Sequence, residues 1–312
     1  MGNRQSQIVN SHVSVVCYFR AHNSPSDLGV KVRRWFPLLL GCIWLSASPL
    51  RGQQRPLKTD DAELVGTGLV RTEFGLEFLQ KQRYSLSGLE GDLARLGVAS
   101  IRVGVGEYAE FQISGVFQDF LSVSSRSTPV PFPPSFTGNS TNDFGDLVLA
   151  SKLRLAPEKG MRPALAFKFA VELPNAKHPS GLGTDQTEFY ASILLTKHIG
   201  RAQVLGNIGM AILGNPVVVG RQTDPLTYGL AFILPMNKKI NLVGEINGRQ
   251  GPLHRVGNEN QSVVRGGLQI RTGSFRWDIA GIAGLKEFNP DSGITVGVTY
   301  EFQAFHKKPT IK

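Results

Sequence analysis

Cysteine is scarce in this sequence, and both of its cysteines lie near one end. Cys17 and Cys42 fall within the first fifty of 312 residues. Because residues 53–312 contain no thiol, a disulfide framework and a thiolate metal site are excluded there. Beyond residue 52 there is also no apolar run of the roughly 20 residues that a membrane-spanning helix needs. Any membrane crossing by this part of the chain must therefore use strands.

Charged residues are also few, at 19% of the chain, and the positive excess is concentrated at the two ends. The formal net charge is +10. Residues 1–52 contain six basic side chains and one acid, Asp27, while residues 307–312 contain three lysines. The body between them is nearly neutral. It has no basic stripe that would follow a phosphate backbone, so we expect no nucleic-acid partner.

The first fifty residues contain the pattern of an export signal. Arg33 and Arg34 precede an apolar stretch, Trp35–Leu45, which is followed by small and turn-forming residues. This order of charged, apolar and cleavable parts is typical of a secretory signal peptide. We expect residues 1–52 to comprise an upstream extension and a signal that is removed, with cleavage near Gly52 or, alternatively, Ala47.

Three other interpretations of this region remain open. Residues 1–30 fit no part of a signal, which suggests that translation starts near Val30 or Val32. Leu39–Cys42 resembles a lipoprotein box, but the apolar run continues beyond it. Val32–Phe36 partly resembles a twin-arginine signal, a route for folded cargo.

From residue 64 onward the dominant pattern is an alternation of period two in segments of about ten residues. Between Asp146 and Leu155, four leucines share one face, and Asp146, Lys152 and Arg154 share the other. No segment has a convincing helical period. The pattern predicts twelve strands, at residues 65–79, 93–104, 110–120, 145–155, 163–173, 187–197, 202–213, 225–235, 240–249, 262–272, 275–285 and 293–303.

The polar faces of these strands distinguish a membrane barrel from a soluble sandwich. They interleave Gly, Ala, Ser, Gln and Asn with Arg and Glu, which suits an enclosed polar interior. The connections alternate between short turns and long loops, the latter including 81–91 and 121–143. Because lipid offers the backbone no hydrogen-bond partner, the first and last strands must pair.

We therefore predict an all-β fold, a transmembrane antiparallel β-barrel of about 12 strands spanning residues 64–303. An even strand number places both ends in the periplasm. Residues 53–63 are then a periplasmic lead, and 304–312 a basic C-terminal tail. The last strand ends in Tyr300 and Phe302, like a signal for the outer-membrane assembly machinery.

Charged residues on the polar faces are the candidate lumen lining. They either neutralise one another across neighbouring strands or line a conduit that selects solutes. The candidates are Arg71, Glu73, Glu77, Asp146, Lys152, Arg154, Lys168, Glu172, Glu188, Arg201, Glu245, Arg265, Arg271, Arg276, Asp278 and Glu301.

The longest expected loop contains a proline-rich stretch, Pro129–Phe136, with two aromatic side chains. Proline restricts its backbone, and Phe132 and Phe136 give it apolar surface. We expect either an inward-folded constriction or lid that uses these two residues, or an exposed irregular loop.

Several segments resemble a known family. Phe144–Arg154, Phe169–Pro174, Gly181–Asp185 and Leu194–Lys197 are similar to the outer-membrane family named for the meta-pathway of phenol degradation. The resemblance covers most of residues 64–302 and implies a barrel that moves hydrophobic or aromatic compounds across the outer membrane. Such proteins often have a Thr-Gly-Asp turn after the proline. Here Pro174 is followed by Asn-Ala-Lys, and if this loop selects the solute, the departure points to a different one.

Few residues in the sequence indicate catalysis or cofactor binding. Gly104–Ala109 matches a loose dinucleotide fingerprint, but a strand pattern follows it where a helix is required. None of the six histidines stands at metal-ligand spacing from Cys, Asp or Glu. A barrel lipid hydrolase would need a Ser and His pair that we do not find. We expect no catalytic, cofactor-binding or metal residues.

The expected function is that of a bacterial outer-membrane channel or transporter for passive uptake of small solutes. Its expected partners are membrane lipid, the assembly machinery and an unidentified solute, with no cofactor. The main alternative is a non-conducting structural or surface-interaction barrel, and a lipid hydrolase is a third.

Overall fold

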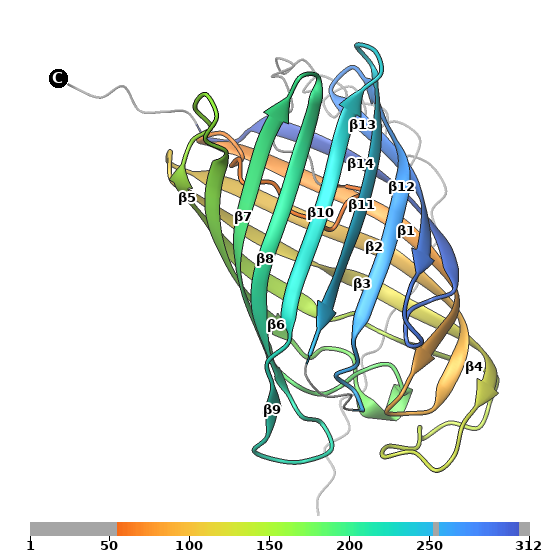
Figure 1. Cartoon of the computed structure of the whole chain (residues 1–312). Coiled ribbons are helices and arrows are strands. Elements are labelled where there is room, and N and C mark those ends of the chain that lie inside the picture. The colour runs from red at the N-terminus through yellow and green to blue at the C-terminus, as the bar shows by residue number, and fades with distance from the viewer. Residues whose placement is uncertain (1–54, 252–255, 306–312) are drawn as a thin grey trace, which may run out of the picture. The chain divides into compact units, whose positions relative to one another are not determined.

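The computed structural model describes residues 55–251 and 256–305, which form a closed barrel of twelve long antiparallel strands (Figure 1). All of them belong to the second of two units of the chain, residues 46–312. The expected signal and the C-terminal tail lie outside the described residues, except for Ala304 and Phe305. The predicted fold class is confirmed.

The strands overlap all twelve predicted segments. They are β1 (Leu69–Tyr84), β2 (Leu89–Val105), β3 (Ala109–Arg126), β5 (Leu147–Ala156), β6 (Ala164–Leu173), β7 (Glu188–Ile199), β8 (Ala202–Gly214), β10 (Leu226–Pro235), β11 (Ile240–Gln250), β12 (Gln261–Thr272), β13 (Phe275–Gly284) and β14 (Ser292–Gln303). Two short strands in the loops, β4 (Ser140–Asp143) and β9 (Gln222–Thr223), were not predicted.

Each long strand pairs with its neighbour in the sequence, and the first strand pairs with the last. β1 and β14 are antiparallel from Leu69 opposite Gln303 to Gln80 opposite Ser292. On the other side of the barrel β10 pairs with both β8 and β11. Closure gives the spanning strands no free edge, which a sheet surrounded by lipid requires.

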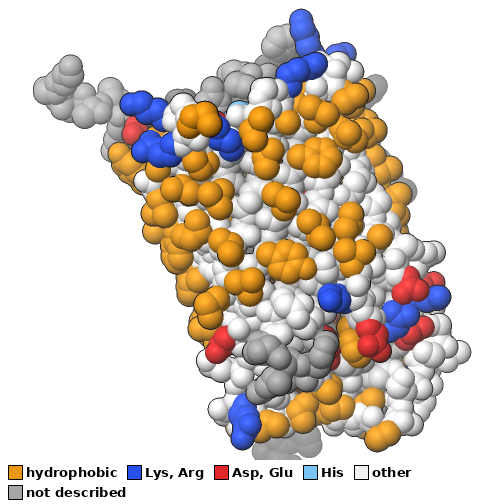
Figure 2. Space-filling model, in the orientation of Figure 1, with side chains coloured by type: hydrophobic (Ala, Val, Ile, Leu, Met, Phe, Trp, Pro, Cys, Tyr) orange, Lys and Arg blue, Asp and Glu red, His pale blue; other side chains and the backbone are white. Residues whose placement is uncertain are grey.

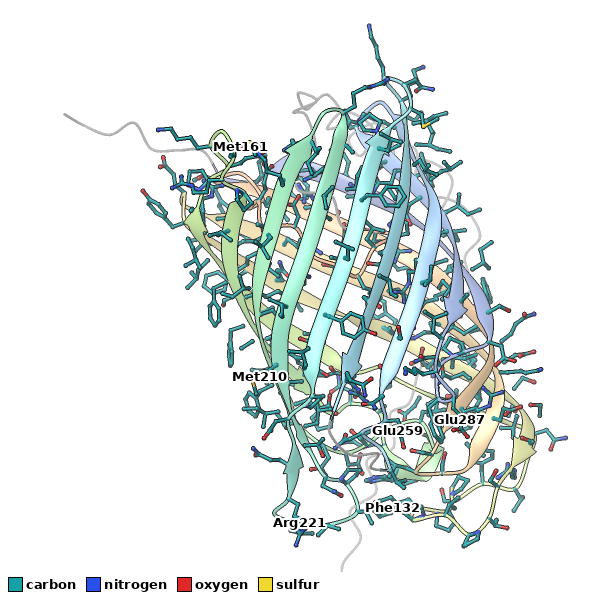
Figure 3. The ribbon with its side chains drawn as sticks, viewed as in Figure 1. Phe132, Met161, Met210, Arg221, Glu259 and Glu287 are labelled. Carbon is teal, nitrogen blue, oxygen red and sulfur yellow. The ribbon has the colours of Figure 1, made fainter. Side chains whose placement is uncertain are left out.

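Connections of two lengths distinguish the two ends of the barrel. Short turns at 106–108, 157–163, 200–201, 236–239 and 273–274 mark the end that we call the turn end. The longer connections lie at the opposite end, which we call the loop end. The short turn between β1 and β2 lies there too. In Figure 3 Met161 lies at the turn end and Phe132 at the loop end. The first strand starts, and the last strand stops, at the turn end.

One predicted loop is wrong. The expected loop at 81–91 is a four-residue turn, 85–88, because β1 and β2 continue past their predicted ends. At 16 and 17 residues these strands exceed the 9–11 that a bilayer crossing requires. Their extensions are held by polar contacts, since Arg83 pairs with Glu90 at 2.8 Å and with Asp291 at 3.1 Å. The polar residues of this region belong to a hairpin that extends beyond the length of a membrane-spanning strand, whereas their polarity predicts a loop.

The outer face of the barrel carries the large apolar side chains. Phe74, Leu149, Phe169, Met210 and Trp277 are all among the exposed hydrophobic residues. Figure 2 shows apolar side chains over the strands, with charged groups gathered toward the two ends. Within the described part of the chain, no helix has the length and apolar character to cross a membrane.

This arrangement predicts the effect of a charge on the outer face. Ile279, in the middle of β13, is 42% exposed. Replacing it with Arg should lower the free energy of unfolding in lipid vesicles by about 2–4 kcal/mol, since the guanidinium would face acyl chains.

Tyr108, in the turn between β2 and β3, is the matched control. The Tyr108→Arg variant should lose only about 0–1 kcal/mol because its side chain can reach the interface. Urea titrations monitored by fluorescence would compare the two. Equal losses would show that the outer face of β13 does not meet lipid.

Candidate functional site

The barrel interior is occupied by the chain that precedes β1. Residues 55–66, which we call the lumen segment, run inside the barrel (orange coil in Figure 1). Leu57, Asp60, Asp61 and Val65 are each no more than 2% exposed. The sequence pattern predicts that residues 53–63 are a periplasmic lead. For residues 55–63 that expectation is wrong, because their backbone and side chains bond to the inner wall.

The first described residue, Arg55, binds the wall near the β1–β14 junction. Its guanidinium donates to Thr295 Oγ1 at 2.9 Å and to the Val296 carbonyl at 3.0 Å, and it lies 3.4 Å from Asp278. Its own carbonyl accepts a bond of 2.7 Å from Gln269 Nε2. Both polar ends of this residue are therefore held by wall side chains.

Glu245 on β11 binds the next part of the lumen segment through backbone groups. The N–H groups of Lys58 and Thr59 donate to its carboxylate at 2.9 and 2.8 Å. Arg265 on β12 donates to the same carboxylate at 3.0 Å. One wall carboxylate thus satisfies two irregular backbone donors that would otherwise be buried without partners.

Asp60 is the most connected group of the lumen segment. Its carboxylate lies 2.7 Å from Lys168 Nζ, 3.3 Å from Arg102 Nη1 and 3.5 Å from Lys152 Nζ. These cations come from β6, β2 and β5. Since an isolated buried charge is strongly unfavourable, Asp60 needs these cations. For Arg102 and Lys152 it adds to the wall carboxylates Glu73 and Glu110.

Hydrogen bonds to the wall continue along the segment. Thr196 Oγ1 donates to Asp61 at 2.8 Å and accepts from the Ala62 N–H at 2.9 Å. Lys152 Nζ donates to the carbonyls of Asp61 and Glu63. The Val65 N–H donates to Glu110 at 2.6 Å. From Arg55 to Val65, the irregular backbone is therefore repeatedly bonded to the wall.

Apolar contacts also hold the lumen segment against the inner wall. Leu57 packs with Leu205, Ala231, Ile233 and Val243 from β8, β10 and β11. Ala62 packs in the same way against Ala164, Ala166 and Leu194. These contacts show that the inner wall includes apolar patches as well as charges.

Glycines in the wall make room for the lumen segment. Gly75 and Gly297 lie opposite each other on β1 and β14, and a Cβ on either would overlap the Arg55 guanidinium. A Cβ on Gly104 would likewise overlap the carbonyls of residues 65 and 66. Glycine is used here for close approach.

A cavity lies on each side of the lumen segment. The one toward the loop end measures about 760 Å³ and is lined by residues 55–60 together with wall side chains that include Tyr84, Arg95, Tyr190 and Arg249. The one toward the turn end measures about 540 Å³, and its lining includes Glu63, His198 and Arg271. The segment therefore stands between two polar spaces of the interior.

Fourteen of the sixteen predicted lumen residues are buried or line one of the two cavities. Nine are buried, namely Arg71, Glu73, Glu77, Lys152, Glu188, Glu245, Arg265, Arg276 and Asp278. Asp146, Lys168 and Glu172 line the loop-end cavity, and Arg201 and Arg271 line the turn-end cavity. Glu301 pairs with Arg71 across β1 and β14, with Arg71 Nε 3.0 Å from its carboxylate. Arg154 is half-buried near the turn end of β5.

Sequence reasoning missed four deeply buried charges of the interior, Asp60, Asp61, Arg102 and Glu110. Asp60 and Asp61 precede the periodic pattern, so no alternation pointed to them. Arg102 and Glu110 lie on the polar faces of β2 and β3 and are 3% and 0% exposed. Glycines at polar-face positions, such as Gly75 and Gly297, were the available signal that something packs closely against the wall.

The proline-rich loop packs at the loop end. Phe136 contacts an apolar cluster inside the mouth, formed by Leu79, Leu89, Leu93, Leu121 and Ile282. The Phe132 ring lies 4.2 Å from the ring of His178 in the β6–β7 loop. Its N–H donates to the Leu86 carbonyl at 3.0 Å. Both aromatic side chains are half-buried, and Phe136 is the one that reaches the interior apolar cluster.

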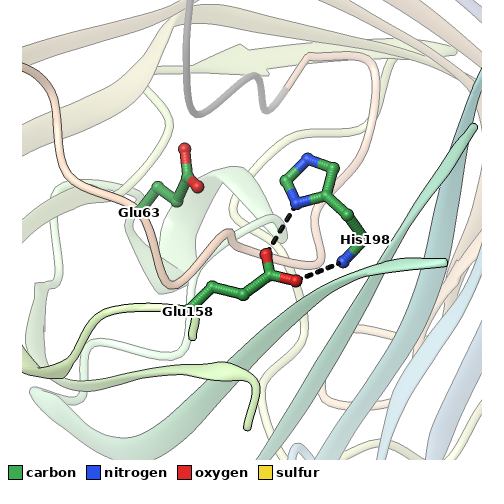
Figure 4. Close-up of side chains that lie close together, drawn as sticks. All are labelled: Glu63, Glu158 and His198. Atoms are coloured by element: carbon green, nitrogen blue, oxygen red, sulfur yellow. Dashed lines mark hydrogen bonds and ion pairs between the residues drawn. The ribbon is translucent and has the colours of Figure 1, made fainter. Parts of the chain in front are cut away.

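A cluster of potential metal ligands lies at the turn end (Figure 4). Glu63, Glu158 and His198 each offer one ligand atom, and these atoms lie within 4.8 Å of one another. His198 Nδ1 is 2.7 Å from Glu158 Oε2. The His198 hydrogen bond and the Lys197 ammonium together lower the pKa of Glu158 to about 2. Sequence spacing did not reveal this set, since its members come from three separate elements.

Comparisons with known proteins identify the fold. No model of a known protein family matches the sequence, and no curated protein sequence matches it. The structure is similar to the crystal structure of an outer membrane channel from Pseudomonas putida F1, with a TM-score of 0.54 and 14% identity over 78% of this chain and 98% of that one. At this identity the likeness extends to the fold alone.

Two further barrels are more distant. The translocator domain of the autotransporter NalP from Neisseria meningitidis has a TM-score of 0.43 and 13% identity over 76% of this chain and 89% of that one. The outer membrane channel DcaP of Acinetobacter baumannii has a TM-score of 0.40 and 9% identity over 75% and 96% of the two chains.

The Asp60 cluster predicts a large effect of a small change. The Asp60→Asn variant should lower the free energy of unfolding by about 3 kcal/mol because three wall cations would lose their shared carboxylate. Urea titration in detergent micelles, monitored by the fluorescence of Trp277, measures this. Asp92→Asn, on the exposed hairpin of β1 and β2, should change stability by less than about 0.5 kcal/mol. Equal effects would contradict the role assigned to Asp60.

Proposed function

We propose that this protein is a bacterial outer-membrane channel in which the lumen segment must move before a solute can pass. The observation that carries the proposal is the position of this segment between two polar cavities, of about 760 and 540 Å³. Both are lined by charged side chains from many strands. A barrel that served only as a scaffold would have no need of polar spaces on both sides of an irregular segment.

The nature of the contacts supports a segment that can be displaced. Residues 55–66 are held mainly by hydrogen bonds and ion pairs, which water can replace one by one as the segment leaves. The segment has only three large aliphatic side chains, Leu57, Leu64 and Val65, and all three are buried. Displacement would join the two cavities into one path.

The solute class follows from the loop-end cavity and from the family resemblance. Tyr84, Tyr190 and Tyr228 line this cavity together with leucines that include Leu93 and Leu182. Such a lining accepts a small solute with an apolar or aromatic part. The resemblance to the meta-pathway family favours the same class. No enzymatic activity is part of the proposal.

A non-conducting barrel is the second candidate, and the density of bonds around Asp60 favours it. In that case the lumen segment would be a permanent part of the interior and would fill it as a core does. Both candidates place the protein in the outer membrane, with membrane lipid and the assembly machinery as partners. The difference between them is whether the segment moves.

A reversible cross-link between the segment and the wall tests the proposal. A Cβ built on Gly229 of β10 lies 3.3 Å from Thr59 Cβ, close to the roughly 3.5–4.5 Å of a disulfide. The Thr59→Cys/Gly229→Cys protein, with Cys17 and Cys42 replaced by Ser, would be placed in planar bilayers. We expect no single-channel events when it is oxidised and events after reduction.

Each outcome separates the candidates. The two single-cysteine variants should conduct alike with and without reductant. Conduction that is equal in the oxidised and reduced double variant would show that ions pass beside a fixed segment, against the proposal. Silence of every form, including the cysteine-free parent, would establish the non-conducting barrel.

A further inference from the structure

We infer that Glu63, Glu158 and His198 form a binding site for a divalent cation of the zinc class at the turn end of the barrel. The three residues come from three separate parts of the chain. Glu63 belongs to the lumen segment, Glu158 to the turn between β5 and β6, and His198 to the end of β7. Figure 4 shows the two carboxylates and the imidazole around one small space.

The distances suit such an ion after small side-chain rotations. One ligand atom of each residue lies within 4.8 Å of the others. Tetrahedral zinc with ligands at about 2.1 Å would need them about 3.4 Å apart. Glu63 and Glu158 have long flexible side chains, so rotation about their side-chain bonds closes the difference without moving the backbone.

The donor set selects the class of cation. One imidazole nitrogen and two carboxylate oxygens match the ligands of zinc and related transition metals, with the fourth position open to water. Calcium prefers six or more oxygen ligands, and magnesium keeps most of its waters. Both calcium and magnesium bind oxygen ligands, so the imidazole nitrogen of His198 would not strengthen their binding.

Neighbouring groups orient the ligands. Lys197 Nζ lies 2.5 Å from Glu158 Oε1 and 2.6 Å from the Gly160 carbonyl, and the His198 N–H donates to the same Oε1 at 3.1 Å. These contacts leave Oε2 directed at His198 Nδ1. The cation needs only Oε2, so the Lys197 contact can remain, although its charge will weaken binding.

Binding replaces a hydrogen bond with bonds to the cation, and it releases a proton only from a charged imidazole. His198 Nδ1 and Glu158 Oε2 are 2.7 Å apart and share a hydrogen bond. When the carboxylate and a ring nitrogen bind the metal, this hydrogen bond is lost, and any excess proton on the imidazole leaves to solvent. Glu63 and His198 both line the turn-end cavity of about 540 Å³, which gives the ion a route from solution.

The site would join the lumen segment to the barrel wall. Glu63 is the ligand from the segment, and Glu158 and His198 are ligands from the wall. A bound ion therefore adds a cross-connection near the point where Lys152 donates to the Glu63 carbonyl at 2.9 Å. The inference stands on ion binding alone and holds whether or not the barrel conducts.

Calorimetric titration of the refolded full chain with zinc chloride tests the site. We expect a binding event in the parent protein that is at least about tenfold weaker in each of Glu63→Gln, Glu158→Gln and His198→Gln. Magnesium and calcium should give no comparable event. Heat-modifiable gel migration would first establish that each variant is folded.

His178→Gln is the matched control. His178 Nδ1 lies 2.6 Å from Asp185 at the loop end, the same kind of pair, but it belongs to no three-ligand cluster among residues 55–251 and 256–305. Zinc affinity of this variant should equal that of the parent. No zinc binding by the parent, equal loss in His178→Gln, or unchanged binding in Glu63→Gln would each overturn the inference, as would calcium binding of equal strength.

Discussion

The carboxylate of Asp60 and the three cations around it hold the interior of this barrel together. Lys168, Arg102 and Lys152 project inward from three different strands, and none can be buried without a counter-charge. Glu73 lies near Arg102 and Glu110 near Lys152, but the carboxylate that all three cations share comes from a segment that belongs to no strand. A closed wall is required by lipid, and a closed wall encloses a space that must be filled by side chains, water or chain. Here a stretch of the same chain fills part of it.

The wall and the lumen segment depend on each other in a simple physical way. Glu245 accepts two backbone N–H groups of the segment, and paired glycines on β1 and β14 leave space for Arg55. The wall thereby satisfies backbone donors that a regular strand would have paired with a neighbour. The outcome is a segment with a polar cavity on each side. In the function that we propose, passage of a solute depends on how readily these bonds exchange with water.

The barrel itself could be predicted from the sequence because alternation over twelve segments is a repeated signal. Leucines and charges between residues 146 and 155 face opposite sides, as expected. The lumen segment has no period, so nothing in Arg55 to Gly66 distinguishes an inner segment from a lead outside the barrel. The extensions of the first hairpin were predicted to be a loop because their residues are polar. Arg83 and Glu90 pair there and stabilise the strands. The Glu63, Glu158 and His198 cluster needed the closed barrel to bring its parts together.

Residues 55–66 occupy the barrel interior, and the reactivity of one introduced thiol distinguishes this position from one outside the barrel. In a cysteine-free background, Thr59→Cys would be exposed to a bulky water-soluble maleimide in the folded protein, with Val219→Cys as reference. Thr59 is 2% exposed and Val219 is 98% exposed. We expect the thiol at 59 to stay unlabelled until the barrel is unfolded and the thiol at 219 to react at once. Equally rapid labelling of both in the folded barrel would contradict it.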